Sequence, residues 1–231
     1  MARIFITGSA SGLGRLAADT LLAAGHEVVV HARSADRLQT DGPAVIGDLA
    51  DAEQARDVAA QVNRLGALDA VIHNAGVYTG TQILAVNVIA PYLLTALIER
   101  PRRLVYLTSG MQDGGRADLD WSAGRVSYSD SKLLVTTLAL AVARLWPGVY
   151  SNAVDPGWVP TRMGGPNAPD DLGLGHLTQE WLATSDDDDA RTSGGLWYHQ
   201  QRRTPPRATL DPRFQDELLA TLADVTGTPL P

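Results

Sequence analysis

The sequence predicts an α/β fold, a doubly wound parallel sheet of about seven strands with helices on both faces in a three-layer sandwich. Short β-branched runs recur along the 231 residues and are followed by helical patterns, an alternation typical of βαβ crossovers. Hydrophobic residues make up 45% and charged residues 19%, a composition that excludes a disordered chain. With no internal repeat or linker, residues 1–231 are expected to form one domain.

The expected strands are short and rich in β-branched residues, as buried parallel strands are. They span residues 3–7, 27–31, 44–46, 68–73, 103–108, 149–154 and 196–199. The first strand follows Met1 almost at once, without the charged and apolar regions of a secretory signal. Because no apolar stretch approaches the roughly 18 residues that span a bilayer, we expect a cytoplasmic protein with no membrane partner.

The expected helices span residues 12–24, 50–65, 82–98, 128–145 and 212–223. The first presents an apolar face of leucine and alanine, and Gly25 ends it as a C′ glycine. Residues 82–98 and 128–145 are apolar on nearly all sides, so each should bury one face on the sheet and another elsewhere. A partner subunit is the natural cover, which predicts a homodimer or homotetramer, although a flap of the same chain could cover that face in a monomer.

After Val154, prolines and glycines mark an irregular segment, about residues 157–190, which we expect to be a built-in substrate lid. Order should return near Leu177. Residues 186–189 are four aspartates, expected to open a helix because carboxylates favour the positive end of its dipole. A proline-rich turn at residues 202–206 should follow the last strand.

Composition excludes several kinds of chemistry. There is no cysteine, so disulfides, thiolate metal sites and cysteine nucleophiles are absent. The net charge of −7 disfavours nucleic acid as a partner, because phosphate binding needs a basic surface. The five histidines show no metal-ligand spacing, so no metal is expected.

The first strand leads through residues 7–14, Thr-Gly-Ser-Ala-Ser-Gly-Leu-Gly, directly into a helix. Glycines in such a turn allow positive φ and a close approach of pyrophosphate, and the helix N-terminus supplies amide donors. The G-x-x-x-G-x-G spacing differs from the commoner G-x-G-x-x-G, and such a turn alone can be purely structural. At the start of a βαβ series, however, it predicts the phosphate cradle of a Rossmann-like dinucleotide-binding domain.

The second strand ends at His31 and is followed by Ala32, Arg33 and Ser34, where such folds contact the adenosine ribose. An acidic residue there would bind the ribose hydroxyls of NAD, whereas a guanidinium can bind the 2′-phosphate of NADP. Arg33 therefore favours NADP(H), with NAD(H) possible. The alternative is a solvated surface arginine.

Tyr128 and Lys132 lie one turn apart on the face of a predicted helix. An ammonium there should stabilise phenolate and lower the tyrosine pKa toward neutrality, which would suit a general acid or base. Ser109 follows a strand and adds a hydroxyl at the carboxyl edge of the sheet, where open α/β folds bind ligands.

In order along the chain, these motifs resemble the classical short-chain dehydrogenase/reductase family over nearly the whole sequence. The matching positions are the glycine loop at residues 7–14, Asp48-Leu49, Asn74-Ala75-Gly76, Asn87, Ser109, Tyr128 with Lys132, and Pro156-Gly157 with Thr161. The segment after Pro156 looks most like carbonyl-reductase and retinol-dehydrogenase-like members.

The resemblance implies hydride transfer between NADP(H) and a ketone or aldehyde, or the corresponding alcohol. Ser109 would bind the carbonyl, Tyr128 would exchange the proton, Lys132 would lower the tyrosine pKa and hold the nicotinamide ribose, and Asn87 would hold a water that relays protons to Lys132. The implied cofactor contacts are Gly8, Ser9, Ser11, Gly12, Leu13, Gly14, Arg33, Ser34, Asp48, Leu49, Asn74, Ala75, Gly76, Tyr128, Lys132, Pro156, Gly157, Val159 and Thr161.

Each role has a simpler alternative. Asn87 could only kink its helix, Ser109 could cap a strand end, and Asp48 could cap the next helix. Ser11 stands where NADP-preferring members often carry a basic residue. The interval from Ser109 to Tyr128 is longer than usual, which predicts a flap over residues 111–127 beside the substrate.

Two other functions remain open from the sequence. One is an NADP-binding sensor without turnover, although such relatives typically lack the tyrosine and lysine. The other is reduction of an imine or an activated alkene with the same fold and cofactor.

Overall fold

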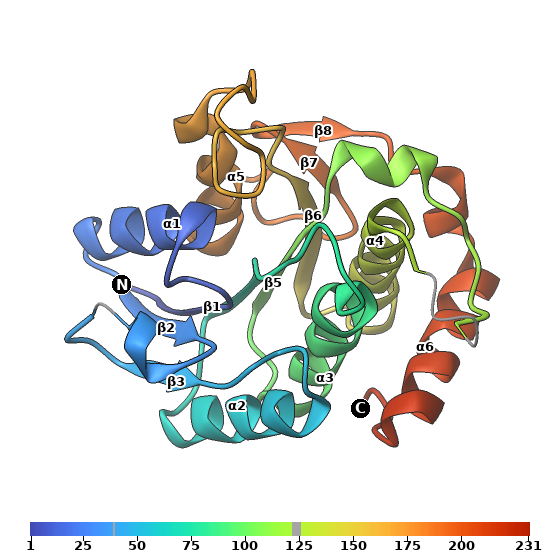
Figure 1. Cartoon of the computed structure of the whole chain (residues 1–231), viewed down its shortest axis with the longest axis horizontal. Coiled ribbons are helices and arrows are strands. Elements are labelled where there is room, and N and C mark those ends of the chain that lie inside the picture. Colours follow the sequence, from blue (N-terminus) through green and yellow to red (C-terminus); the bar gives the residue numbers. More distant parts are fainter. Residues whose placement is uncertain (39, 122–125) are drawn as a thin grey trace.

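The computed structural model describes residues 1–38, 40–121 and 126–231, and its centre is one eight-stranded sheet in the order β3-β2-β1-β4-β5-β6-β7-β8 (Figure 1). Strands β1 to β7 pair in parallel and β8 is antiparallel to β7. The bounds are β1 (Arg3–Ile6), β2 (Glu27–Ala32), β3 (Ala44–Ile46), β4 (Ala70–His73), β5 (Arg103–Leu107), β6 (Tyr150–Asp155), β7 (Leu196–Tyr198) and β8 (Gln201–Arg203). The α/β class and all seven expected strands are confirmed, and β8 occupies part of the expected proline-rich turn.

The order of the strands reverses at β1, which lies between β2 and β4. In register, Ile4 of β1 stands opposite Val28 on one side and Ala70 on the other. Because the strands are parallel, the loops that follow β1, β4, β5 and β6 all emerge at one edge. Open α/β sheets bind ligands at this edge, beside the reversal point.

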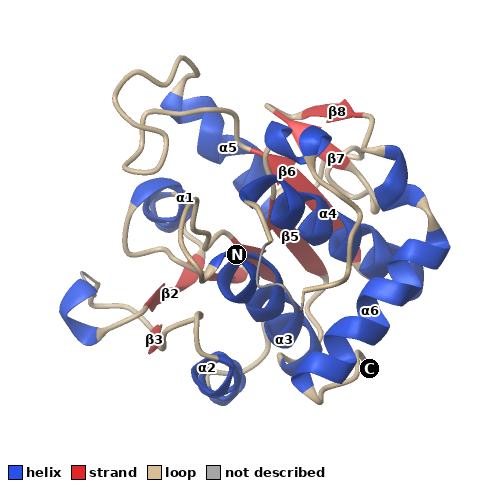
Figure 2. Cartoon of the chain, turned by 45° about the vertical axis from the view of Figure 1, so that its right-hand side comes forward, coloured by secondary structure: helices blue, strands red, loops and turns tan. Residues whose placement is uncertain are grey.

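Helices cover both faces of the sheet, as Figures 1 and 2 show. Helices α1 (Gly12–Ala23) and α5 (Leu172–Thr184) pack together on one face, where Ala17, Leu21 and Leu182 join an apolar cluster with Ile4 and Ile6. The second face carries α2 (Ala52–Arg64), α3 (Ala90–Leu97) and α4 (Tyr128–Leu145), with α6 (Pro212–Thr226) outside α4. Both faces of a parallel sheet must be buried, and this arrangement buries them.

Helix α4 buries two faces, as its sequence predicts, but the second cover is α6 of the same chain. Phe214, Leu218 and Leu222 of α6 belong to the apolar cluster that contains Leu134 and Leu138 of α4. The segment beyond α6 is also anchored, since the Tyr92 hydroxyl donates to the Thr228 carbonyl at 2.7 Å and the Trp146 indole N–H donates to the Pro231 carbonyl at 2.9 Å. Because α6 covers the outer face of α4, this face no longer argues for a homo-oligomer. A homodimer or homotetramer stays a prediction.

Other expectations about local structure need correction. Helix α5 begins at Leu172, so the irregular part of the expected lid is confined to the loop between β6 and α5, drawn in tan beside α5 in Figure 2, and to a shorter stretch after α5. Residues 186–189 do not open a helix. They follow the end of α5, where the Asp187 carboxylate accepts from the Trp181 indole N–H at 2.7 Å and Asp188 pairs with Arg191.

The expected helix at residues 82–98 is interrupted by a π-helical turn at Ala85–Ile89, directly before α3. Of the expected flap, residues 122–125 lie outside the described residues, and Gly110–Gly114 form a short 3₁₀ helix. No helix in the described ranges is long and apolar enough to cross a membrane.

We predict that Leu218→Ala lowers the free energy of unfolding by about 2–5 kcal/mol, because the fully buried side chain leaves a cavity between α6 and α4. Val225→Ala is the matched control, since Val225 is 57% exposed on the same helix. Urea unfolding measures both variants. If Leu218→Ala and Val225→Ala lower the free energy of unfolding equally, the packing of α6 over α4 is contradicted.

Candidate active site

The glycine loop between β1 and α1 requires glycine at several positions, and it is open to solvent at Gly12, where a Cβ would meet nothing within 4 Å. Gly8 and Gly12 have φ of +67° and +60°, a region that favours glycine. A Cβ on Gly14 would lie 2.3 Å from Asn74 Nδ2 and 2.8 Å from the Gly8 carbonyl oxygen, so only glycine allows this contact. Within the described chain, the N-cap residue Ser11 makes no side-chain cap bond to α1. The first amides of α1 are thus available to an anion at the ligand-binding edge.

The loop after β4 is tied to the glycine loop by hydrogen bonds. Asn74 Nδ2 donates to the Thr7 carbonyl at 2.9 Å, and the Ala75 amide donates to Thr7 Oγ1, also at 2.9 Å. Two segments of the predicted cofactor site, far apart in sequence, are therefore held as one unit.

The ends of β2 and β3 carry the residues predicted to contact adenosine. Arg33 is exposed and directly follows β2. Asp48 is half-buried, and its Oδ1 accepts from the Ala50 amide at 3.0 Å. Helix α2 is capped by Asp51, which accepts from the Glu53 amide at 2.9 Å, so Asp48 is not its N-cap.

The predicted catalytic side chains come together at the ends of β5 and α4. Ser109 follows β5 and Tyr128 is the first residue of α4, so both hydroxyls lie at the carboxyl edge of the sheet. The Tyr78 ring meets the Tyr128 ring edge-on with centroids 4.8 Å apart. The buried Lys132 Nζ lies 5.5 Å from the centroid of the Tyr128 ring and donates to the Leu107 carbonyl at 2.7 Å.

The expected lowering of the Tyr128 pKa is wrong for this structure. Burial raises the pKa of Tyr128 to about 12, and the electrostatic effects of Asp155 and Tyr78 add to this shift, while the nearby Ser109 hydroxyl opposes it. Burial also lowers the pKa of Lys132 to about 8, against the attraction of Asp155. Sequence spacing reveals the tyrosine–lysine pair, but it does not reveal how far burial disfavours both charged forms. Tyr128 is therefore a neutral phenol that can donate a proton.

Asn87 lies in the π-helical turn and connects three segments. Its side chain accepts from the Val77 amide at 2.9 Å and donates to the Val77 carbonyl and to Ser131 Oγ, each at 3.0 Å. Ser131 precedes Lys132, so Asn87 braces the loop after β4 against the helix that carries the lysine. The π turn also agrees with the simpler alternative, in which Asn87 marks a helix irregularity.

The start of the lid is held by carboxylates that sequence reasoning missed. The Gly157 amide donates to Asp155 Oδ1 at 3.0 Å, and the Trp158 amide donates to Asp170 Oδ2 at 2.6 Å. Gly157 has φ of +81°, and a Cβ there would lie 2.5 Å from Asp170 Oδ2. Among the other lid residues predicted to contact cofactor, Val159 is buried and Thr161 Oγ1 accepts from the Gly164 amide at 3.3 Å.

A third carboxylate, Asp130, fixes the start of α4. It completes a capping box with Ser127 and pairs with Arg116 at 3.0 Å, and these contacts hold its pKa well below the usual range. The S-x-x-D pattern at residues 127–130 could have indicated this cap from the sequence. Because Ser127 is the N-cap, Tyr128 is the first residue of α4.

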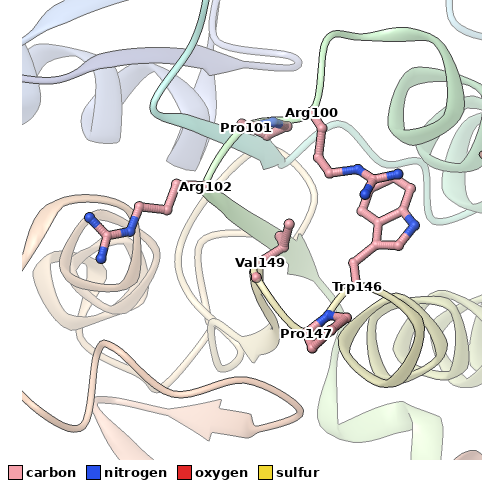
Figure 3. Close-up of a pocket in the computed structure, with 7 residues that line it drawn as sticks. Arg100, Pro101, Arg102, Trp146, Pro147 and Val149 are labelled. Atoms are coloured by element: carbon pink, nitrogen blue, oxygen red, sulfur yellow. The ribbon is translucent and has the colours of Figure 1, made fainter.

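Figure 3 shows a hollow at the opposite, amino-terminal edge of the sheet, with a volume of about 440 Å³. Arg100 stacks on Trp146 with its guanidinium carbon 3.9 Å from the ring centroid, whereas Arg102 points away from it. The guanidinium groups of Arg100 and Arg102 therefore do not point into one common site, and the hollow does not form an anion-binding site. The candidate active site remains at the carboxyl edge of the sheet. The described residues also contain no group of three or more histidine, aspartate or glutamate side chains suited to a metal ion.

Comparison with known proteins agrees with this geometry. A family model described as short chain dehydrogenase matches residues 2–98. The chain is 35% identical to short-chain dehydrogenase chyC of Penicillium rubens over the full length of both proteins. Among solved structures, it is similar to an uncharacterized protein of Mycobacterium paratuberculosis, with a TM-score of 0.82 and 22% identity, covering 100% of this chain and 95% of that one. A blue fluorescent protein from a metagenomic library, in complex with NADPH, gives a TM-score of 0.72 and 20% identity over 85% of this chain and 95% of the other.

Proposed function

The chain belongs to the short-chain dehydrogenase family, and on that premise we propose that it transfers hydride between NADP(H) and a ketone or aldehyde, or the corresponding alcohol. The observation that carries this proposal is the grouping of Ser109 and Tyr128 at the carboxyl edge of the sheet beside the buried Lys132, whose Nζ lies 5.5 Å from the centroid of the Tyr128 ring. Two hydroxyls at the ligand-binding edge can donate to one carbonyl oxygen and stabilise the negative charge that develops on it.

In the reduction, bound NADPH supplies the hydride. The Ser109 and Tyr128 hydroxyls orient the carbonyl, and Tyr128 gives its proton to the oxygen. The raised pKa of Tyr128 keeps this proton in place at neutral pH. Lys132, with a pKa of about 8, still carries its ammonium there and favours the phenolate that remains. We assign Asn87 to holding a water that returns a proton towards Lys132.

The dinucleotide is supported by the shape of the glycine loop. The open space beside Gly12, the positive φ of Gly8 and Gly12 and the open amides at the start of α1 fit a pyrophosphate. Residues that would hold the rest of the cofactor are Ser9, Ser11, Gly12, Leu13, Arg33, Ser34, Asp48, Leu49, Asn74, Ala75, Gly76, Tyr128, Lys132, Pro156, Gly157, Val159 and Thr161.

A preference for NADP(H) over NAD(H) is supported by Arg33, an exposed guanidinium directly after β2, and by the absence of an acidic residue at Ala32 to Ser34. A guanidinium forms strong paired hydrogen bonds to phosphate. The similar blue fluorescent protein was solved with NADPH, which agrees with this assignment.

The substrate that this edge favours is a carbonyl compound with a large apolar substituent. Tyr78, Met111, Trp158 and Met163 are each between 46% and 59% exposed. Tyr78 touches the Tyr128 ring, Met111 follows Ser109 by two residues, and Trp158 follows Gly157. Exposed apolar side chains gathered in the loops of one edge are typical of a binding site. Trp181 does not join this group, because it packs against Trp197 of β7.

Tyr128→Phe should lower kcat for carbonyl reduction by about 10²–10⁴-fold while NADPH binding stays nearly unchanged, because only the transferred proton is lost. Steady-state kinetics and calorimetric titration with NADPH measure the two effects. Tyr150→Phe is the control, since Tyr150 begins β6 at the opposite edge. Near wild-type turnover by Tyr128→Phe would contradict the proposed role of Tyr128 as the proton donor.

Arg33→Ala should raise KM for NADPH by about 10- to 100-fold, because a charge-assisted hydrogen bond to the 2′-phosphate is lost. KM for NADH should change little. Arg64→Ala removes the same charge from the exposed last turn of α2 and should alter neither value. If Arg33→Ala weakens both cofactors equally, the assignment of Arg33 to the 2′-phosphate is wrong.

A further inference from the structure

His31, the fifth residue of β2, makes an unusual set of contacts in the cofactor-binding half of the molecule. The side chain is 3% exposed. The Gly8 amide donates to Nδ1 at 2.9 Å, and Nε2 lies 2.9 Å from the Gly47 carbonyl oxygen. The His31 amide itself donates to Ser9 Oγ at 2.8 Å. One residue therefore contacts the glycine loop twice and the segment after β3 once.

These contacts define the protonation state of the ring. A backbone N–H can only donate, so Nδ1 accepts from Gly8 and the ring proton lies on Nε2, which donates to Gly47. Burial lowers the pKa of His31 and favours this neutral form, against opposing effects of the Gly47 hydrogen bond and the charge of Asp48. The imidazole thus acts as a fixed, directional bridge between two backbones.

Both ends of the bridge are closely packed. A Cβ on Gly8 would lie 3.1 Å from Ala75 Cα, and a Cβ on Gly47 would lie 2.6 Å from Val58 Cγ2. Gly47 is followed by Asp48, whose amide donates to Gln54 Oε1 at 2.9 Å. The backbone at each end can therefore move little, and the ring between them sets their separation.

We propose that His31 is a positioning residue for the dinucleotide, holding the glycine loop at a fixed distance from the Gly47–Asp48 turn. This inference rests on the proposed function, in which the first segment holds the pyrophosphate and the second the adenosine. A rigid spacing between these subsites favours binding because less order has to be imposed when the ligand binds.

A second buried histidine shows what a purely structural role looks like. His73, the last residue of β4, is 2% exposed, stacks on the Tyr106 ring with centroids 4.5 Å apart and lies 3.3 Å from Thr95 Oγ1. Its side-chain contacts lie in the core beneath α3 rather than in a ligand loop. His73 therefore provides a matched control for burial and for loss of an imidazole.

The test is calorimetric titration of NADPH into the full-length protein and three variants, with thermal unfolding measured alongside. His31→Leu should weaken NADPH binding by about tenfold or more, because the two contacts of the imidazole, with Gly8 and with Gly47, are lost. His31→Asn should recover part of this affinity, since its amide oxygen can accept from Gly8 as Nδ1 does. His73→Leu should lower thermal stability without weakening NADPH binding.

The results separate the possible failures. Wild-type affinity for NADPH in His31→Leu, or losses equal to those in His73→Leu, would overturn the positioning role. If His31→Leu does not fold, His31→Asn decides alone: a Kd weaker than that of the wild type with an unchanged KM for the carbonyl substrate supports the role, and an unchanged Kd overturns it. Failure of the wild-type protein itself to bind NADPH would instead refute the proposed function.

Discussion

A parallel sheet must have both faces covered and every strand joined by a crossover, and the rest of this structure depends on that constraint. The crossovers bring the glycine loop, the Asn74 loop, Ser109 and the start of the lid to one edge, although they span most of the chain. Covering the second face requires α4, whose apolar surface is so extensive that α6 packs over it in turn. The helix that carries Tyr128 and Lys132 is thus held between sheet and C-terminal segment, which gives the two side chains fixed positions.

Three carboxylates fix backbone segments at this edge, although the proposed ligand is itself an anion. Asp130 caps α4 and pairs with Arg116, and Asp155 and Asp170 accept amides at the start of the lid. The chain carries a net charge of −7, so phosphate affinity must come from local sources. Those sources are the open amides of α1, the open space beside Gly12 and the exposed Arg33.

Much of the fold and of the candidate site could be predicted because both depend on local sequence patterns. The strands and the helices α1, α2 and α4 follow from periodicity, and Gly8, Gly14, Tyr128 and Lys132 follow from spacing. The remainder depends on contacts between distant segments. Spacing could not show that α6 covers α4, that α5 ends before the aspartates at 186–189, that burial raises the pKa of Tyr128, or that His31 bridges Gly8 and Gly47. Each of these is a property of packing, and no short sequence window contains it.

We infer that Ser109, Tyr128 and Lys132 together reduce carbonyl compounds with NADPH. The most direct measurement is the rate of nicotinamide oxidation by the wild-type protein across a panel of ketones and aldehydes with large and small apolar substituents, run in parallel with NADPH and NADH. We expect NADPH to be oxidised in step with alcohol formation, fastest for the larger apolar carbonyls, and we expect slower oxidation of NADH. Tight binding of NADPH with no oxidation across the whole panel would contradict this inference and favour a dinucleotide sensor.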